Sequence, residues 1–387
     1  MNFIHTADWQ LGKPFASVDD PDKAAKLRSE RIEVIKRIGK IASELKTDFV
    51  LVAGDLFDSF TADKSTVSAT CGALAEIKVP IIAIPGNHDH GGPGCLWEQD
   101  FFRSERESLA SHLQVVLSPE PFNLDQATVF PCPLLRRHQS TDPTAWIRDF
   151  DFDSLTDTDK PRLVLAHGSV HGFDSSGSDE ENETLGTPNL IALDRLPLNE
   201  IDYVALGDWH GTKEVSASAW YAGTPEIDRF PKGEENNPGN ILHVSVERGQ
   251  KPRVEVVPTT GLHWHSLEFN FVSDDDLGTL GETLSEATGD RVREDLIHLI
   301  LNGSLGMNAC NRLDQLLDTW ESRLLRLKRK QEIRIAPTEE EIESLTQRAA
   351  DPLIAQVALR LLEDSAKDGE NSELTHVALR ELYAALQ

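Results

Sequence analysis

Apolar and polar residues alternate with two different periods along the first part of the chain. Short apolar runs predict strands at Asn2–Ala7, Phe49–Ala53 and Val79–Pro85. Between them, apolar residues at helical spacing predict helices over Lys26–Leu45 and Ser65–Ile77. This β-α-β-α-β order predicts a sheet core with helices packed outside it.

Shorter strand-like runs continue as far as residue 271. Five strands are predicted at Gln114–Leu117, Ala127–Phe130, Arg162–Ala166, Asp202–Leu206 and Ala219–Ala222. Three further runs, at Asn240–Glu247, Arg253–Val257 and His263–Phe271, are separated by turn sequences and are expected to be successive antiparallel strands. The stretch 173–186 is acidic and has no basic residue, which is typical of a solvated loop.

The sequence pattern changes after residue 271. Helices are predicted over Ser273–Thr288 and Leu313–Lys328, and strands at Leu296–Asn302 and Gln331–Ile335. From Thr338 onward the pattern is helical, with two amphipathic stripes. We therefore expect a main domain over 1–271, a small α+β module over 272–337 and a helical tail over 338–387.

Composition limits the class of protein. The chain has 65 acidic and 38 basic residues and a formal charge of −27, which argues against a protein that coats nucleic acid, because phosphate contacts need clustered Lys and Arg. DNA as a substrate held by a local basic strip is not excluded. The chain has no apolar run of membrane-spanning length, no signal-peptide pattern and four widely spaced cysteines, so a cytoplasmic, reduced protein is expected.

Polar clusters follow five of the predicted strands. In chain order they contain Asp8 and Gln10; Asp55 and Asp58; Asn87, His88 and Asp89; His167; and Asp208 and His210. The carboxyl ends of such strands meet at one edge of an α/β sheet, where these folds place their sites. Any one cluster is weak evidence for a functional site, whereas all five in order, each at the end of a predicted strand, are strong evidence for one.

The order of these motifs resembles that of the calcineurin-like metallophosphoesterases, and within them the SbcD-type DNA repair exonuclease subunits. The resemblance implies an α/β fold, a sheet sandwich flanked by helices, with a small α+β cap module and a helical C-terminal tail. It implies two divalent metal ions. Asp8, Gln10, Asp55 and His210 would hold the first ion, and Asp55, Asn87, His167 and Asp208 the second.

The resemblance also gives roles to two residues that do not hold metal. His88 would stabilise the developing charge of the scissile phosphate or protonate the leaving group, and Asp58 would orient the imidazole of His88. Gln10 and Asp208 stand where the family has histidine. Each keeps an oxygen that can bind metal, and the added carboxylate favours Mn²⁺, or else Mg²⁺, over zinc. The alternative is a decayed site that binds one metal or none.

Partners are expected at the C-terminal part of the chain. The densest basic segment contains Arg323, Arg326, Lys328, Arg329, Lys330 and Arg334, which would contact DNA or else form a solvated helix face. The resemblance implies that the helical tail docks on a coiled-coil ATPase of the SbcC type and that the protein is a dimer. The alternative for the tail is packing on its own body.

The sequence therefore predicts a metal-dependent DNA phosphodiester hydrolase, the nuclease subunit of an end-processing complex. Two alternatives stay open. One is a calcineurin-like phosphatase or phosphodiesterase that acts on small substrates. The other is a scaffold without activity that holds DNA or the ATPase.

Overall fold

The structure is a computed structural model that describes residues 1–170, 188–230, 236–348, 351–365 and 372–386. It divides into two compact units, Met1–Gly261 and Leu262–Gln387. The predicted acidic loop at 173–186 lies outside the described residues. Among the described residues, no helix is long and apolar enough to cross a membrane.

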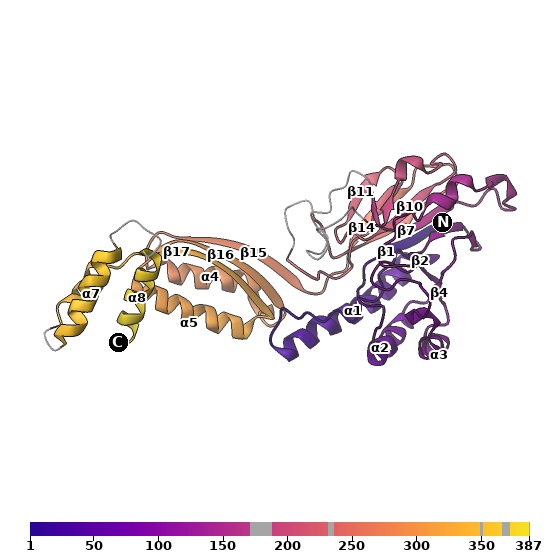
Figure 1. The fold of residues 1–387 in the computed structure, drawn as a ribbon. Coiled ribbons are helices and arrows are strands. Elements are labelled where there is room, and N and C mark those ends of the chain that lie inside the picture. Colours follow the sequence, from indigo (N-terminus) through magenta and orange to yellow (C-terminus); the bar gives the residue numbers. More distant parts are fainter. Residues whose placement is uncertain (171–187, 231–235, 349–350, 366–371, 387) are drawn as a thin grey trace. The chain divides into compact units, whose positions relative to one another are not determined.

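The first unit is built on two six-stranded sheets (Figure 1). The first sheet has the order β14 (Arg253–Pro258), β13 (Asn240–Ser245), β1 (Asn2–Thr6), β2 (Phe49–Val52), β3 (Ile81–Ala83) and β4 (Leu113–Val115). The second has the order β11 (Lys213–Ser216), β12 (Ala219–Tyr221), β10 (Tyr203–Gly207), β7 (Arg162–His167), β6 (Thr128–Cys132) and β5 (Phe122–Asn123). A two-stranded pair, β8 (Ser169–Val170) and β9 (Leu190–Ile191), falls between β7 and β10 in the sequence.

Apolar layers pack on both faces of the first sheet. Alternate residues of β1 point to opposite faces, so Ile4 packs with the helices while Phe3 faces the second sheet. The helices on the first sheet are α1 (Pro21–Leu45), α2 (Lys64–Leu74) and α3 (Asp100–Leu109), and Figure 1 shows all three on one side of it. The predicted sheet sandwich with flanking helices is confirmed.

The second unit has a three-stranded parallel sheet in the order β15 (His263–Phe271), β16 (Asp295–Leu305) and β17 (Arg326–Ile335). Helices α4 (Asp276–Thr288) and α5 (Met307–Arg323) connect the strands and cover one face, as Figure 1 shows. Helices α6 (Glu339–Thr346), α7 (Pro352–Ser365) and α8 (Ser372–Ala384) follow.

Two predictions about this unit are wrong. His263–Phe271 is not antiparallel to its predecessors, because it pairs in parallel with β16 through a β-α-β crossover. The helix predicted to reach Lys328 ends at Arg323, since Leu324 is extended and the chain then pairs with β16 from Arg326 onward. The basic residues from Arg326 onward therefore lie on a strand.

Candidate metal centre

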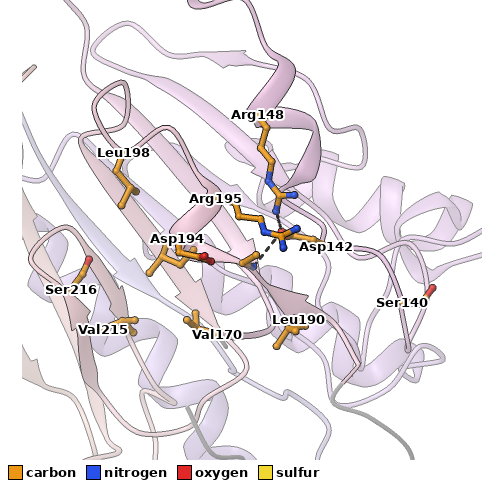
Figure 2. Close-up of a pocket in the computed structure, with 12 residues that line it drawn as sticks. Ser140, Asp142, Arg148, Val170, Leu190, Asp194, Arg195, Leu198, Val215 and Ser216 are labelled. Carbon is orange, nitrogen blue, oxygen red and sulfur yellow. Dashed lines mark hydrogen bonds and ion pairs between the residues drawn. The ribbon is translucent and has the colours of Figure 1, made fainter. Parts of the chain in front are cut away.

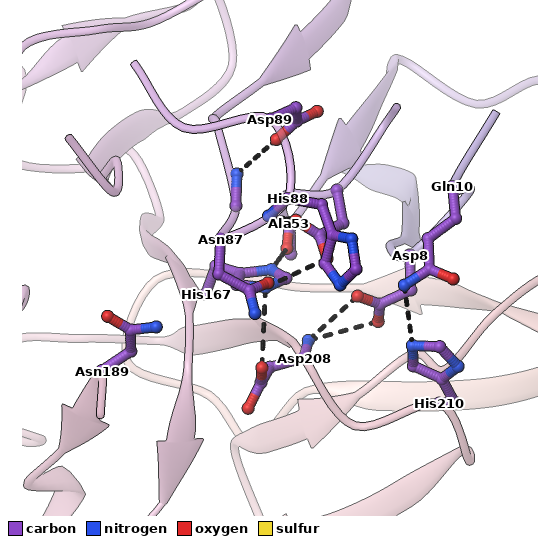
Figure 3. Close-up of polar contacts among 12 residues, drawn as sticks. Asp8, Gln10, Ala53, Asn87, His88, Asp89, His167, Asn189, Asp208 and His210 are labelled. Atoms are coloured by element: carbon purple, nitrogen blue, oxygen red, sulfur yellow. Dashed lines mark hydrogen bonds and ion pairs between the residues drawn. The ribbon is translucent and has the colours of Figure 1, made fainter. Parts of the chain in front are cut away.

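The candidate ligands lie at the carboxyl ends of strands from both sheets (Figure 3). Asp8, Asp55 and Asn87 follow the parallel strands β1, β2 and β3. His167 ends β7 and Asp208 follows its parallel neighbour β10. The two layers of the sandwich thus contribute to a single cluster of polar side chains.

Four of the candidate ligands have a left-handed backbone, which L-residues rarely adopt. The φ angles are 53° at Asp8, 41° at Gln10, 55° at Asp55 and 102° at Asp208. Strained residues of this kind concentrate at functional sites, where the surrounding structure holds them in place. The turns therefore direct side chains into the site at a conformational cost that a simple loop would avoid.

Two glycines let the ligand strands approach closely. A Cβ on Gly86 would lie 2.1 Å from the Asp55 Oδ1 atom, and one on Gly54 would lie 2.3 Å from the His167 Nδ1 atom. Both distances are shorter than any contact a Cβ makes. Glycine at these positions is thus a requirement of the site's packing.

Asp8, Asp55 and His167 form a compact group, with one ligand atom from each within 4.8 Å of the others, and all three are buried. Burial, together with Asp55 and Asp208, raises the pKa of Asp8 well above its usual range. Burial opposes a charge on His167, but the carboxylates of Asp55, Asp8 and Asp208 raise its pKa to about 9. This excess of buried negative charge, formed by oxygen and imidazole donors, fits a divalent cation.

Asn87 and Asp208 contact the same histidine. His167 Nε2 lies 3.0 Å from Asn87 Oδ1, 3.7 Å from Asp55 Oδ2 and 3.8 Å from Asp208 Oδ1. His167 Nδ1 lies 2.7 Å from the carbonyl oxygen of Ala53, which can only accept, so Nδ1 carries a proton and Nε2 faces the cluster. The predicted ligands of the second ion, Asp55, Asn87, His167 and Asp208, are therefore together.

The predicted ligands of the first ion are arranged differently. The amide nitrogen of Gln10 lies 3.2 Å from His210 Nε2, and its amide oxygen accepts a hydrogen bond of 2.8 Å from Lys13. On its other side, His210 Nδ1 lies 3.3 Å from the buried Asp228. The two side chains thus contact each other, with a lysine and an aspartate alongside them.

His88 lies beside the cluster. Its backbone N–H donates to Asp55 Oδ1 at 3.0 Å, and its Nδ1 lies 3.0 Å from the main-chain carbonyl oxygen of Asp58. Burial raises the pKa of Asp58. The structure thus gives a contact between the ring and the backbone of Asp58, and the orienting role of its carboxylate stays a prediction.

Two residues to which the sequence gave no role support the site. The carboxylate of Asp89 accepts from the N–H groups of Gly86 at 2.7 Å and Phe57 at 3.1 Å, which joins two ligand loops, and burial raises its pKa to about 7. Arg31 of α1 donates to the carbonyl oxygens of Asp8 and Trp9. The sequence signal that could have marked Arg31 is its place between Leu27 and Ile35 on the apolar face of the helix, where a charged residue is unusual.

A separate hollow of about 700 Å³ in the first unit contains none of the predicted site residues in its lining (Figure 2). Val170, Leu190 and Arg195 contribute to its wall. Asp142, also in the wall, pairs with Arg148 and accepts from the Ala192 N–H, so its charge is already used to hold the wall together. The metal centre is thus the better candidate for chemistry.

The six basic residues of the predicted DNA contact belong to the second unit and do not form one surface. Arg326, Lys328, Lys330 and Arg334 occupy alternate positions of β17 and share one face of it. Arg329 is on the opposite face, 3.5 Å from Glu321 of α5, and Arg323 lies in the last turn of that helix. Four of the six therefore form a row on an edge strand, which Glu332 interrupts between Lys330 and Arg334, at 2.6 Å from Lys330.

Comparison with known proteins identifies the family. The family model of calcineurin-like phosphoesterases matches residues 1–212, more than half of the chain. The chain belongs to this family and is a hydrolase of the metallophosphoesterase superfamily, whose members use divalent metals. A curated relative, the SbcD subunit of the nuclease SbcCD from Staphylococcus epidermidis, is 23% identical over 272 residues, which cover 67% of this chain and 69% of the relative.

Likenesses to solved structures are looser. TT1561 of Thermus thermophilus is 14% identical with a TM-score of 0.39, over 66% of this chain and 98% of that one. Purple acid phosphatase PPD1 from yellow lupin is 14% identical with a TM-score of 0.36, over 67% of this chain and 53% of that one. Scores this low add nothing to the family assignment.

Proposed function

We propose that this protein is a metal-dependent phosphodiester hydrolase that cleaves DNA, as the nuclease subunit of an end-processing complex. The observation that carries the proposal is the convergence of Asp8, Asp55 and His167 with Asn87 and Asp208 at the edge of the sandwich. The relative named as a nuclease subunit supports the choice of DNA.

In this proposal Asp55, Asn87, His167 and Asp208 hold one divalent ion, and Asp8, Gln10 and His210 join Asp55 at a second position. Mn²⁺ is the proposed ion, with Mg²⁺ next, because the donors are mostly oxygens. When bound, such ions polarise a phosphate and activate a water. His88, at the rim of the cluster, is the residue proposed to stabilise or protonate the phosphate oxygens during cleavage.

The row of basic side chains on β17 is the proposed contact for the DNA backbone. Lys328, Lys330 and Arg334 are exposed, while the opposite face of the sheet is covered by helices. Charged side chains on an edge strand also prevent unwanted sheet pairing, which is the competing explanation for the row. Salt-dependent DNA binding that falls when these charges are reversed would separate the two explanations.

The last two helices are the proposed dock for an SbcC-type ATPase. Part of their apolar surface packs within the second unit, where Ala358 and Leu379 are fully buried. Other apolar side chains are exposed, with Leu353 at 73% and Leu374 at 69%. Because single exposed apolar residues are common, the test is whether an ATPase partner still co-purifies after deletion of residues 351–387.

The experiment that tests the substrate class measures hydrolysis of two compounds by the purified chain, first with Mn²⁺ and then with Mg²⁺. One is end-labelled linear DNA and the other is a small chromogenic phosphodiester. Cleavage of DNA supports the nuclease. Cleavage of only the small ester favours a phosphatase or phosphodiesterase that acts on small molecules, and inactivity on both favours a scaffold.

A further inference from the structure

The predicted first metal position contains a lysine ammonium group within hydrogen-bonding distance of a candidate ligand. Lys13 Nζ lies 2.8 Å from Gln10 Oε1 and 2.8 Å from Asp228 Oδ2. An ammonium group has three donors and no acceptor, so the atom of Gln10 that faces it must be the oxygen. The amide nitrogen of Gln10 is then fixed toward His210.

This arrangement engages both candidate ligand atoms. The oxygen that Gln10 would offer to a metal already accepts from Lys13, and His210 Nε2 faces the amide nitrogen of Gln10 at 3.2 Å. A divalent ion on that oxygen would lie next to a positive charge, which would repel it. Binding at the first position therefore places the ion beside the Lys13 ammonium group and requires that the Gln10 amide nitrogen leave His210 Nε2.

Lys13 is held firmly in this place. Its side chain is 20% exposed, and that of its partner Asp228 is 2% exposed. Lys13 Nζ lies 2.8 Å from Asp228 Oδ2, so the buried carboxylate anchors the ammonium group, and removing the lysine would take one cation away from that carboxylate.

The second position is built from a different set of contacts. The side chains of Asp55, Asn87 and His167 contact one another and nearby backbone groups. Asp208 adds its carboxylate near His167 and accepts a hydrogen bond of 2.8 Å from the hydroxyl of Ser169, not from a lysine. Each position thus has two carboxylates, one amide and one imidazole, and the two positions differ in the lysine ammonium group that contacts the amide of the first.

We propose that the centre is asymmetric and that Lys13 serves as a built-in cation at the first position. One divalent ion binds tightly among Asp55, Asn87, His167 and Asp208, and the position beside Gln10 and His210 binds a second ion only weakly. This inference concerns the ligand set of the proposed function and rests on that assignment. It also explains how glutamine is accepted at position 10, because the amide can accept from Lys13 and donate toward His210 at the same time.

The test is a titration of the metal-free full chain with Mn²⁺. Isothermal titration calorimetry measures the affinity and the number of ions bound, and electron paramagnetic resonance shows whether the bound ions are isolated or neighbouring. The wild type should bind one Mn²⁺ tightly and show the signal of an isolated ion. Lys13→Met should strengthen the second binding event about tenfold or more, since a unit charge is removed from beside it. A spin-coupled signal of two neighbouring ions should then appear at lower Mn²⁺ concentration.

Lys40→Met is the matched control, because Lys40 is exposed on α1 and its removal changes the net charge by the same amount. Two equal sites in the wild type, no tight site at all, or a titration that Lys13→Met leaves unchanged would each overturn the inference. If Lys13→Met does not fold, the wild-type stoichiometry alone decides. A chain that binds one tight ion but never cleaves DNA would refute the proposed function and leave the asymmetric centre standing.

Discussion

The buried side chain of Arg31 fixes the loop that carries the first candidate ligand. Its Nε donates to the Trp9 carbonyl at 2.7 Å, and its Nη2 donates to the Asp8 carbonyl at 3.1 Å. Nη1 donates to the Glu226 carbonyl at 3.1 Å, and Nη2 also reaches the Thr224 hydroxyl at 3.2 Å. Replacing Arg31 with methionine keeps an apolar stem and removes every one of these donors.

The cost follows from the acceptors that lose a donor. Two buried carbonyl oxygens, those of Asp8 and Trp9, would be left unsatisfied, at about 1–3 kcal/mol each, whereas the Glu226 carbonyl still accepts from the Thr224 hydroxyl. Burying the guanidinium has a desolvation cost, which also lowers the pKa of Arg31 in the folded protein. Removing the guanidinium removes this cost and so offsets part of the lost stability. We therefore expect Arg31→Met to destabilise the first unit by about 3–5 kcal/mol, as breaking a buried charged network does.

The measurement is urea unfolding followed by tryptophan fluorescence, together with Mn²⁺ affinity at low urea. Arg31→Met should lower both the free energy of unfolding and the affinity for Mn²⁺, since the turn that carries Asp8 loses its hydrogen-bond donors. Arg28→Met is the control, because Arg28 is on the same helix, is exposed and donates to the Pro14 carbonyl. A variant at position 31 that loses no more stability than the control would refute the reasoning.

Three further predictions follow from buried or charged positions. Burial lowers the pKa of His5 to about 3, so below pH 6.5 the unfolded chain binds a proton that the folded chain does not. The free energy of unfolding should therefore fall as the pH drops from 6.5, by about 3 kcal/mol at pH 4, and His5→Asn should flatten this pH dependence in urea unfolding. Gly86→Ala should displace the Asp55 carboxylate and weaken Mn²⁺ binding in calorimetry. Lys328→Glu with Lys330→Glu should weaken DNA binding and reduce its salt slope by about two in a fluorescence titration.

Matched controls exist for the last two predictions. A Cβ on Gly72 meets nothing within 4 Å, so Gly72→Ala on α2 should leave Mn²⁺ binding unchanged and stabilise the helix slightly. Arg329→Glu changes a charge on the helix-covered face and should alter DNA affinity less than the pair of lysines. Equal effects of variant and control in either experiment would contradict the structural reason given.

The sheet core was predictable from sequence because its strands are short apolar runs, five of them followed by a polar motif, whereas the sandwich was expected only from the family resemblance. Asp8 and Asp55 come together because the ends of neighbouring parallel strands of one sheet meet, which the sequence pattern indicates, whereas His167 reaches them from the second sheet. His5, inside the predicted first strand, is a buried core residue that contacts Tyr203 and the Leu206 carbonyl.

Other features could not be predicted from local pattern. Asp228 reaches Lys13 across 215 positions of the chain, and no spacing rule connects them. The segment after Arg323 continues a helix-compatible composition, and only pairing with β16 makes it a strand. Residues whose partners are distant in sequence are thus the ones that the sequence leaves undetermined.

The most direct test of the central claim compares wild type and His88→Ala on end-labelled linear DNA in Mn²⁺, with metal content measured in the same samples. The side chain of His88 is not a proposed ligand, so the variant should keep its metal. We expect DNA cleavage to be about 10²–10⁴-fold slower in His88→Ala than in the wild type, the contribution of one acid–base group. Undiminished cleavage by the variant, or no cleavage by metal-loaded wild type with or without the ATPase partner, would contradict it.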